Sequence, residues 1–173
     1  MTDDLGRLDR TGDRWRLTFD RRLPQPPDTV FAALTEPEHL AAWFPSSIDG
    51  DREAGAKLRF DFRDGADGPP LEGEMLAWDP PRLVEFTWGE DTLRFELAPD
   101  GAGTRLTLVN TFVEQGKGAR DGAGWHTCLD LLAADLAGAP PFDSTTRWRE
   151  VHPRYVDALG PGAATIGPPP GHG

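Results

Sequence analysis

Apolar and polar residues alternate over several short stretches of the chain, which is typical of half-buried β-strands. The first stretch runs from Trp15 to Leu23. Later stretches carry the apolar positions Leu58, Phe60 and Phe62; Leu71 to Trp78; Val84, Phe86 and Trp88; Leu93, Phe95 and Leu97; and Leu106 and Leu108. The pattern predicts about six or seven strands.

Short segments rich in Asp, Gly and Pro separate these later stretches. They are Asp64-Gly65, residues 67–70, residues 79–81, residues 89–91 and Asp100-Gly101. Such residues favour tight turns, because glycine adopts positive φ and proline fixes φ near −65°. Consecutive strands are therefore expected to be antiparallel neighbours in one sheet.

Two short helices are predicted directly after the first strand. Prolines at 24, 26 and 27 end that strand and suit the first turn of a helix. Apolar residues then recur at helical spacing at Val30, Phe31, Leu34, Leu40 and Trp43. Thr35 and Glu38 have the spacing of a capping box, which predicts that the second helix begins at Thr35.

A longer helix is predicted near the C-terminal end, over residues 122–137. One apolar stripe has helical spacing and consists of Trp125, Cys128, Leu129, Leu132, Ala133 and Leu136. Asp121 is the candidate cap and Gly138 the candidate stop. A further short helix, interrupted by Pro153, is expected between Thr146 and Leu159.

These elements predict an α+β fold in which a curved antiparallel sheet wraps around the long C-terminal helix, a helix-grip arrangement. The domain is expected over residues 13–138, after a flexible N-terminus at residues 1–12. Residues 139–159 are expected to form a short helical C-terminal extension. Residues 160–173 are rich in Gly, Pro and Ala and are expected to be disordered, because they offer too little apolar surface to offset their ordering entropy.

Composition excludes several classes of partner. The formal net charge is -11, which argues against nucleic acid and anionic membrane surfaces as partners. No apolar run is long enough to cross a bilayer, and the N-terminus lacks the apolar core of a signal peptide. A lone cysteine, Cys128, excludes an internal disulfide. We therefore expect a cytoplasmic protein; whether it forms a homodimer is left open.

Three segments carry a resemblance to a known family: residues 30–44, residues 79–88 and residues 124–132. Together they resemble the SRPBCC (START-like, helix-grip) superfamily, and most closely its heat-shock-protein-90 ATPase activator-like branch. The resemblance implies the helix-grip fold and a cavity between the concave sheet face and the long helix. It implies no single activity, because proteins of this superfamily include ligand carriers, cyclases and hydroxylase subunits.

The resemblance implies a cavity whose wall comes from Phe60, Phe62, Phe86, Trp88, Phe95 and Trp125. Trp43 of the second short helix is counted with this lining, and so is His126, because it stands beside Trp125 at the start of the long helix. We predict that it binds a small lipophilic or aromatic ligand. The simpler alternative is that these side chains fill an ordinary core.

Other candidate chemistry is weaker. His126 is a candidate acid or base, and Glu72 with Glu74 is a candidate carboxylate pair, although i and i+2 spacing also describes a solvated strand face. Cys128 lies two positions from His126 and thus roughly on the opposite helix face, so an inert buried thiol is expected. Gly116-Lys117-Gly118 lacks the Ser or Thr of a phosphate-binding loop and is interpreted as a lid or hinge.

No metal site and no cofactor are predicted, because His39, His126 and His152 have no ligand-like spacing. Two alternative functions stay open. One is a polyketide-cyclase-like or hydrolase-like enzyme that uses His126 and Glu74. The other is a chaperone-linked interaction module, which would require a contiguous exposed apolar patch.

Overall fold

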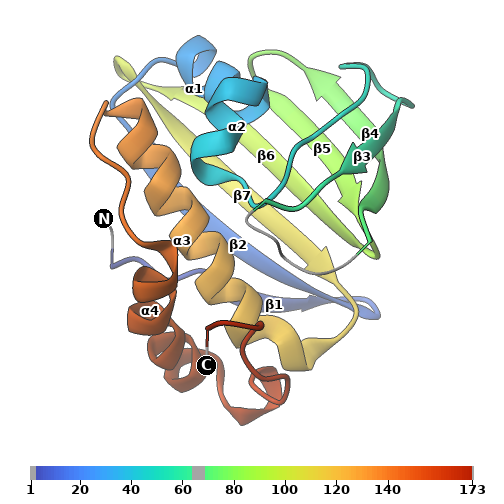
Figure 1. The fold of residues 1–173 in the computed structure, drawn as a ribbon, viewed down its shortest axis with the longest axis vertical. Helices are drawn as coiled ribbons and strands as arrows, with labels where there is room; N and C mark the ends of the chain where they lie inside the picture. The colour runs from blue at the N-terminus through green and yellow to red at the C-terminus, as the bar shows by residue number, and fades with distance from the viewer. Residues whose placement is uncertain (1–2, 64–68, 173) are drawn as a thin grey trace.

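A seven-stranded antiparallel sheet forms the body of the computed structural model, which describes residues 3–63 and 69–172. The spatial order is β1-β2-β7-β6-β5-β4-β3 (Figure 1). The strands are β1 (Arg7–Thr11), β2 (Arg14–Leu23), β3 (Lys57–Phe60), β4 (Leu71–Asp79), β5 (Leu83–Trp88), β6 (Asp91–Asp100) and β7 (Gly103–Phe112). This sheet confirms the predicted architecture, while the expected turn at residues 64–65 and part of that at residues 67–70 lie outside the described residues.

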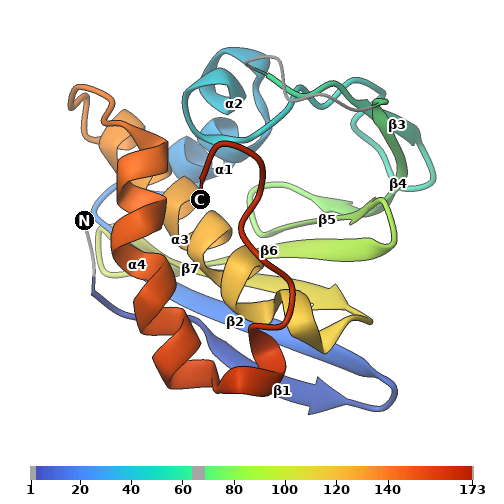
Figure 2. The same cartoon turned by 60° about the horizontal axis from the view of Figure 1, so that its bottom comes forward.

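The helices cover the concave face of the sheet (Figure 2). Their bounds are α1 (Pro27–Thr35), α2 (Pro37–Trp43), α3 (Gly118–Leu136) and α4 (Ser144–Leu159), with short 3₁₀ turns η1 (Gln115–Lys117) and η2 (Pro161–Ala163). The long helix α3 runs diagonally across the sheet, α1 and α2 cover one end, and α4 packs beside α3 (Figure 1). The predicted long helix gripped by the sheet is confirmed.

Prolines set the ends of the first two helices. A residue that precedes proline is pushed out of the helical region into an extended conformation. Glu36 before Pro37 has ψ 136° and separates α1 from α2, and Phe44 before Pro45 has ψ 144° and ends α2. The capping box predicted at Thr35 is wrong: Thr35 is the last residue of α1, and its Oγ1 donates a hydrogen bond to the carbonyl of Phe31.

The glycine-rich segment before the long helix is part of a packed helix start. Helix α3 begins at Gly118, so Asp121 lies in its first turn and does not cap it. A Cβ at Gly116 would collide with Oγ1 of Thr165, and a Cβ at Gly122 would lie 2.8 Å from the Tyr155 ring. These glycines allow close approach of neighbouring segments, which differs from the predicted lid or hinge.

Both ends of the chain are more ordered than the sequence suggests. Strand β1 pairs with β2 where a flexible N-terminus is expected; only Leu8 is apolar in it, so the pattern gives no signal. In the expected disordered tail, Ala163 is fully buried and the amide of Ile166 donates to the carbonyl of Gly116. Small residues suit this segment because it lies against the glycine-rich start of α3.

Tyr155 fastens α4 to the rest of the fold. Its side chain is fully buried, and its hydroxyl accepts a hydrogen bond from the Gly6 amide at 2.8 Å and lies 2.9 Å from Nδ1 of His126. Burial raises the pKa of Tyr155 to about 12. The phenol of Tyr155 in the folded protein is therefore neutral at pH values below about 12.

The close contact between α3 and α4 can be tested with two glycines of the same helix. In Gly122→Ala the new methyl group would meet the Tyr155 ring, so we expect the free energy of unfolding to fall by about 1–3 kcal/mol. In Gly124→Ala the methyl group meets no atom within 4 Å, and the better helix propensity of alanine should raise stability by up to about 1 kcal/mol. Urea denaturation of both variants measures the difference, and equal effects would contradict the contact.

Tyr155 should also give the protein a defined alkaline limit. Its folded pKa lies above the unfolded value of about 10, so its stabilising contribution is complete below pH 10 and is lost as pH rises toward 12, by about 1.4 kcal/mol per pH unit. Because the pKa of the Cys128 thiol is also raised to about 12, the comparison is made in a Cys128→Ala background. We expect Tyr155→Phe to weaken the fall in unfolding free energy between pH 10 and 12; identical slopes would show that Tyr155 does not titrate there.

Candidate functional site

Aromatic side chains from strands and helices converge between the sheet and the helices, and we call this group the aromatic cluster. Its members are Trp43 and Phe44 at the end of α2, Phe60 and Phe62 in and after β3, Phe86 and Trp88 of β5, Phe95 of β6, and Trp125 of α3. The alternation of strand side chains places Phe86 and Trp88 on the same face. The structure therefore brings together every residue predicted to line the site except His126.

Two rings connect the aromatic cluster. The Phe44 ring centroid lies 5.1 Å from that of Trp43, 5.2 Å from that of Trp88 and 5.8 Å from that of Trp125. The Trp88 ring lies 4.9 Å from Phe60 and 6.1 Å from Trp125. Most of these pairs have the edge-to-face geometry that aromatic rings prefer. The rings thus contact one another directly.

Burial changes from one side of the aromatic cluster to the other. Phe60 is fully buried and Trp43 is only 3% exposed, whereas Phe62 and Trp88 are half-buried. The cluster therefore has a closed end under α2 and an open end at Phe62 and Trp88.

Phe44 is the member that the sequence analysis missed. It lies at the C-cap of α2 and is 3% exposed. Because it follows the last predicted helical position, Trp43, periodicity did not assign it to a face. The Phe44-Pro45 pair was the available signal, since the residue before proline leaves the helix and can turn its side chain back onto the sheet.

His126 lies outside the aromatic cluster, in a buried polar network between α3 and α4. The network consists of His126, Asp130, Arg147 and Tyr155. Nδ1 of His126 lies 2.9 Å from the Tyr155 hydroxyl, and Nε2 lies 3.4 Å from Nη2 of Arg147. Arg147 Nε donates to Asp130 at 2.9 Å. With no exposed surface and a partner at each ring nitrogen, His126 serves the packing of α4.

The candidate carboxylate pair faces away from the concave side. Glu72 and Glu74 are exposed, whereas Met75 is buried. A β-bulge between Met75 and Ala77 shifts the register against β5. The bulge explains why the apolar residues of this strand change parity in the sequence. Glu74 is exposed to solvent, whereas His126 is buried between α3 and α4, so the two side chains lie on different sides of the structure.

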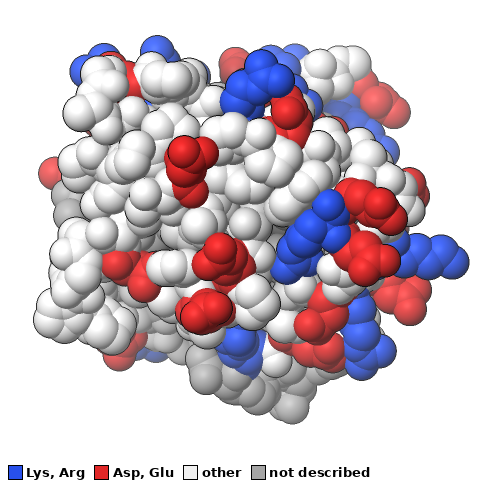
Figure 3. Space-filling model, turned by 90° about the horizontal axis from the view of Figure 1, so that it is seen from above, with Lys and Arg blue, Asp and Glu red and all other residues white. Residues whose placement is uncertain are grey.

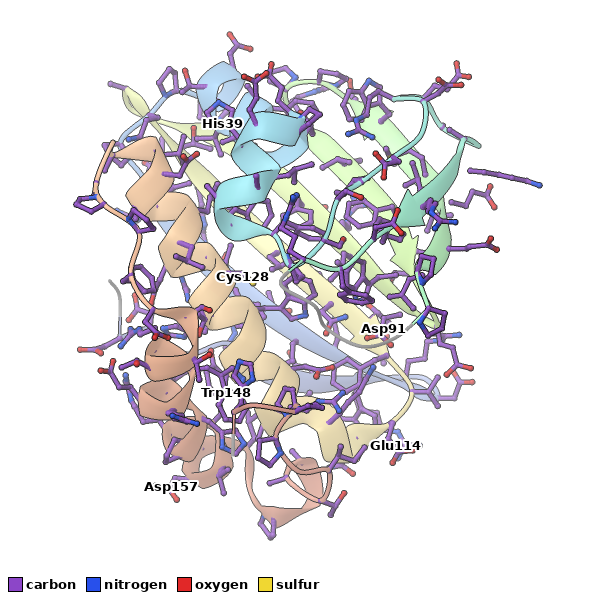
Figure 4. All side chains as sticks on the ribbon, in the orientation of Figure 1. His39, Asp91, Glu114, Cys128, Trp148 and Asp157 are labelled. Carbon is purple, nitrogen blue, oxygen red and sulfur yellow. The ribbon has the colours of Figure 1, made fainter. Side chains whose placement is uncertain are left out.

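The thiol of Cys128 is not activated. Part of the surface of Cys128, which is labelled in Figure 4, is exposed, yet the surrounding protein desolvates the sulfur and raises the pKa of the thiol to about 12. Little thiolate is therefore present at neutral pH.

The remaining candidate residues have partners of their own. Nδ1 of His39 lies 2.8 Å from Asp135, and His152 stacks on Trp148 with ring centroids 4.3 Å apart. Over residues 3–63 and 69–172, no group of His, Cys, Asp and Glu side chains could hold a metal ion. Lys117 Nζ lies 2.7 Å from both carboxylate oxygens of Asp91, so it is not directed at a phosphate.

Pockets on the surface of the described residues also lie away from the aromatic cluster. One, of about 480 Å³, lies beside α1 and includes Phe31, Trp78 and Pro80. Another, of about 330 Å³, includes Arg94 and Glu96. On the face shown in Figure 3, acidic and basic side chains are interspersed and the basic ones form no continuous stripe. Among the helices of the described chain, none combines the length and apolar character that a membrane span requires.

Solved structures with the same fold come from several bacteria. CalU16 from Micromonospora echinospora is 24% identical, with a TM-score of 0.69 over 89% of this chain and 94% of that chain. A conserved protein of unknown function, EF2215 from Enterococcus faecalis, is 19% identical, with a TM-score of 0.72 over 89% and 90%. The protein encoded by gene BPP1335 of Bordetella parapertussis is 27% identical, with a TM-score of 0.67 over 81% and 84%.

The family model described as "Activator of Hsp90 ATPase homolog 1-like protein" matches residues 24–137, whereas no curated protein matches the sequence. These residues run from the start of α1 to the end of α3 and contain the whole aromatic cluster. The chain therefore belongs to the Activator of Hsp90 ATPase homolog 1-like family of the SRPBCC superfamily.

Proposed function

We propose that this protein binds a small lipophilic or aromatic molecule between the concave face of the sheet and α3. The observation that carries the proposal is the gradient of burial across the aromatic cluster. Its closed end is a packed core, while its open end presents Phe62 and Trp88 partly to solvent. An apolar molecule would enter there and exchange contacts with water for contacts with rings.

Binding requires rearrangement at the open end, because the rings touch one another in the structure. Trp88 is the side chain best placed to move. It is half-buried, and it contacts Phe62, itself half-buried, at a centroid distance of 5.7 Å. A rotation of Trp88 would give the ligand access to Phe62 and Trp125, which both contact Trp88, without disturbing the fully buried end.

The two other functions have less support. An enzyme that uses His126 and Glu74 would need both side chains at one ligand, and they lie on different sides of the structure. An interaction module would need a contiguous apolar surface. The large apolar side chains exposed within the described residues are Leu76 and Val113, in β4 and just after β7.

The proposal predicts saturable binding of an uncharged aromatic probe, 2-methoxynaphthalene, to the full chain. At a ligand concentration of 100 times Kd, binding adds about 2.7 kcal/mol, which should raise Tm by roughly 5–10 °C. Thermal unfolding monitored at increasing probe concentration measures the shift. Absence of a saturable shift with this probe and with 2-naphthol would overturn the proposal.

The position of binding is tested by two matched tryptophan variants. Trp88→Ala should lower the affinity for 2-methoxynaphthalene by about tenfold or more, since aromatic contacts of this kind are worth 0.5–1.5 kcal/mol beyond the area that they bury. Trp78→Ala is the control, because Trp78 is also half-buried near a strand end but contacts Phe31, outside the aromatic cluster. An equal loss of affinity in both variants would contradict binding at the open end.

A further inference from the structure

A small group of polar side chains lies on the concave face beside the aromatic cluster. It consists of Asp91 of β6, Asn110 of β7, Lys117 of η1 and Asp121 of α3, and we call it the polar corner. The odd-numbered residues of β6 and the even-numbered residues of β7 face inward, as the burial of Leu93 and Leu108 shows. Asp91, which is labelled in Figure 4, shares the parity of Leu93, and Asn110 shares that of Leu108, so both side chains point toward the helices.

Asn110 carries an unpartnered buried acceptor. The side chain has no exposed surface, and its Oδ1 makes no hydrogen bond within the described chain. Its Nδ2 lies 3.4 Å from Oδ2 of Asp91 and 3.3 Å from the carbonyl of Thr92. Because both neighbours of Nδ2 are acceptors, the amide nitrogen must face them and the oxygen must face elsewhere. A buried acceptor of this kind favours a group that donates a hydrogen bond to it.

The charges of the polar corner are already matched. Lys117 Nζ lies 2.7 Å from both carboxylate oxygens of Asp91 and 3.6 Å from Oδ2 of Asp121. Arg120 Nε donates to Asp121 at 2.8 Å. Two carboxylates therefore face two cations, and neither an anion nor a cation would find an uncompensated charge there. The group that suits Asn110 is neutral.

The polar corner adjoins the open end of the aromatic cluster. Asp91 is the strand partner of Trp88 across the β5–β6 turn. Asp121 precedes Trp125 by about one turn of α3, on the same helix face. The rings of Trp88 and Trp125 lie 6.1 Å apart. A ligand between these two rings would thus have the polar corner next to it.

We propose that the natural ligand is an aromatic or polycyclic molecule with a neutral hydrogen-bond donor, a hydroxyl or an N–H group, which it donates to Oδ1 of Asn110. Its rings lie against Trp88 and Trp125. This inference rests on the proposed function, and it adds to it the polarity of the ligand and the residue that selects it. Molecules of the same shape without a donor would leave Oδ1 of Asn110 unsatisfied and bind less tightly.

The test compares 2-naphthol with 2-methoxynaphthalene, which has the same ring system but no donor. Isothermal titration of the full chain at pH 7, where the naphthol is neutral, gives both dissociation constants. We expect 2-naphthol to bind roughly 3- to 10-fold more tightly, the factor of one hydrogen bond. In Asn110→Leu, which keeps a side chain of similar size and removes the acceptor, the two constants should become equal.

The outcomes separate the two proposals. Equal affinities of the two probes in the wild-type chain would overturn the assignment of Asn110, because Oδ1 of Asn110 would then accept a hydrogen bond from a structural water only. The proposed binding of apolar ligands would still stand. A preference for 2-naphthol that persists in Asn110→Leu would also overturn it. Binding of neither probe would overturn both. Should Asn110→Leu fail to fold, as judged by circular dichroism and urea denaturation, the wild-type ratio still decides.

Discussion

The concave face of the sheet must be covered, and this requirement organises the molecule. Every second residue of the inner strands points to that face, and most of these residues are apolar, among them Leu17 in β2, Phe95 in β6 and Leu108 in β7. Leaving such a surface in water would cost about 25 cal/mol for each Å². Helix α3 covers most of it, and α1 with α2 covers the end near β5. The aromatic cluster lies where these helices meet, which is why its rings come from both layers.

Much of this fold could be predicted from residue patterns. Apolar residues recur with a period of 2 in the inner strands and with a period of about 3.6 in α3, because each of these elements has one buried face. These periods identify the elements in the sequence. Strand β1 has no such signal, since it is held by backbone hydrogen bonds at the edge of the sheet. The bulge in β4 and the close packing of Gly116 and Gly122 were also missed. They depend on which segment lies opposite, and that is a property of the tertiary structure.

The candidate site likewise contains residues that local sequence patterns predict and residues that only the tertiary structure brings together. Strand alternation correctly grouped Phe60, Phe86 and Trp88, because the face of a strand residue follows from its parity. His126 was placed beside Trp125 on the ground of adjacency, although consecutive residues of an α-helix point about 100° apart. That rotation turns His126 toward α4. The polar corner was not predicted, because its members are distant in sequence. They become neighbours only because β6 pairs with β7 and because η1 places Lys117 next to Asp91.

The hydrogen bond between the Gly6 amide and Tyr155 joins residues separated by 149 positions. Strand β2 likewise pairs with β7, whose residues 104–112 come much later in the chain. Contacts of such long range raise the contact order and slow folding. During synthesis, the first two strands would wait as a hairpin with an apolar face open until most of the chain has left the ribosome. The net negative charge of the chain opposes aggregation before folding is complete, because incompletely folded chains of like charge repel one another.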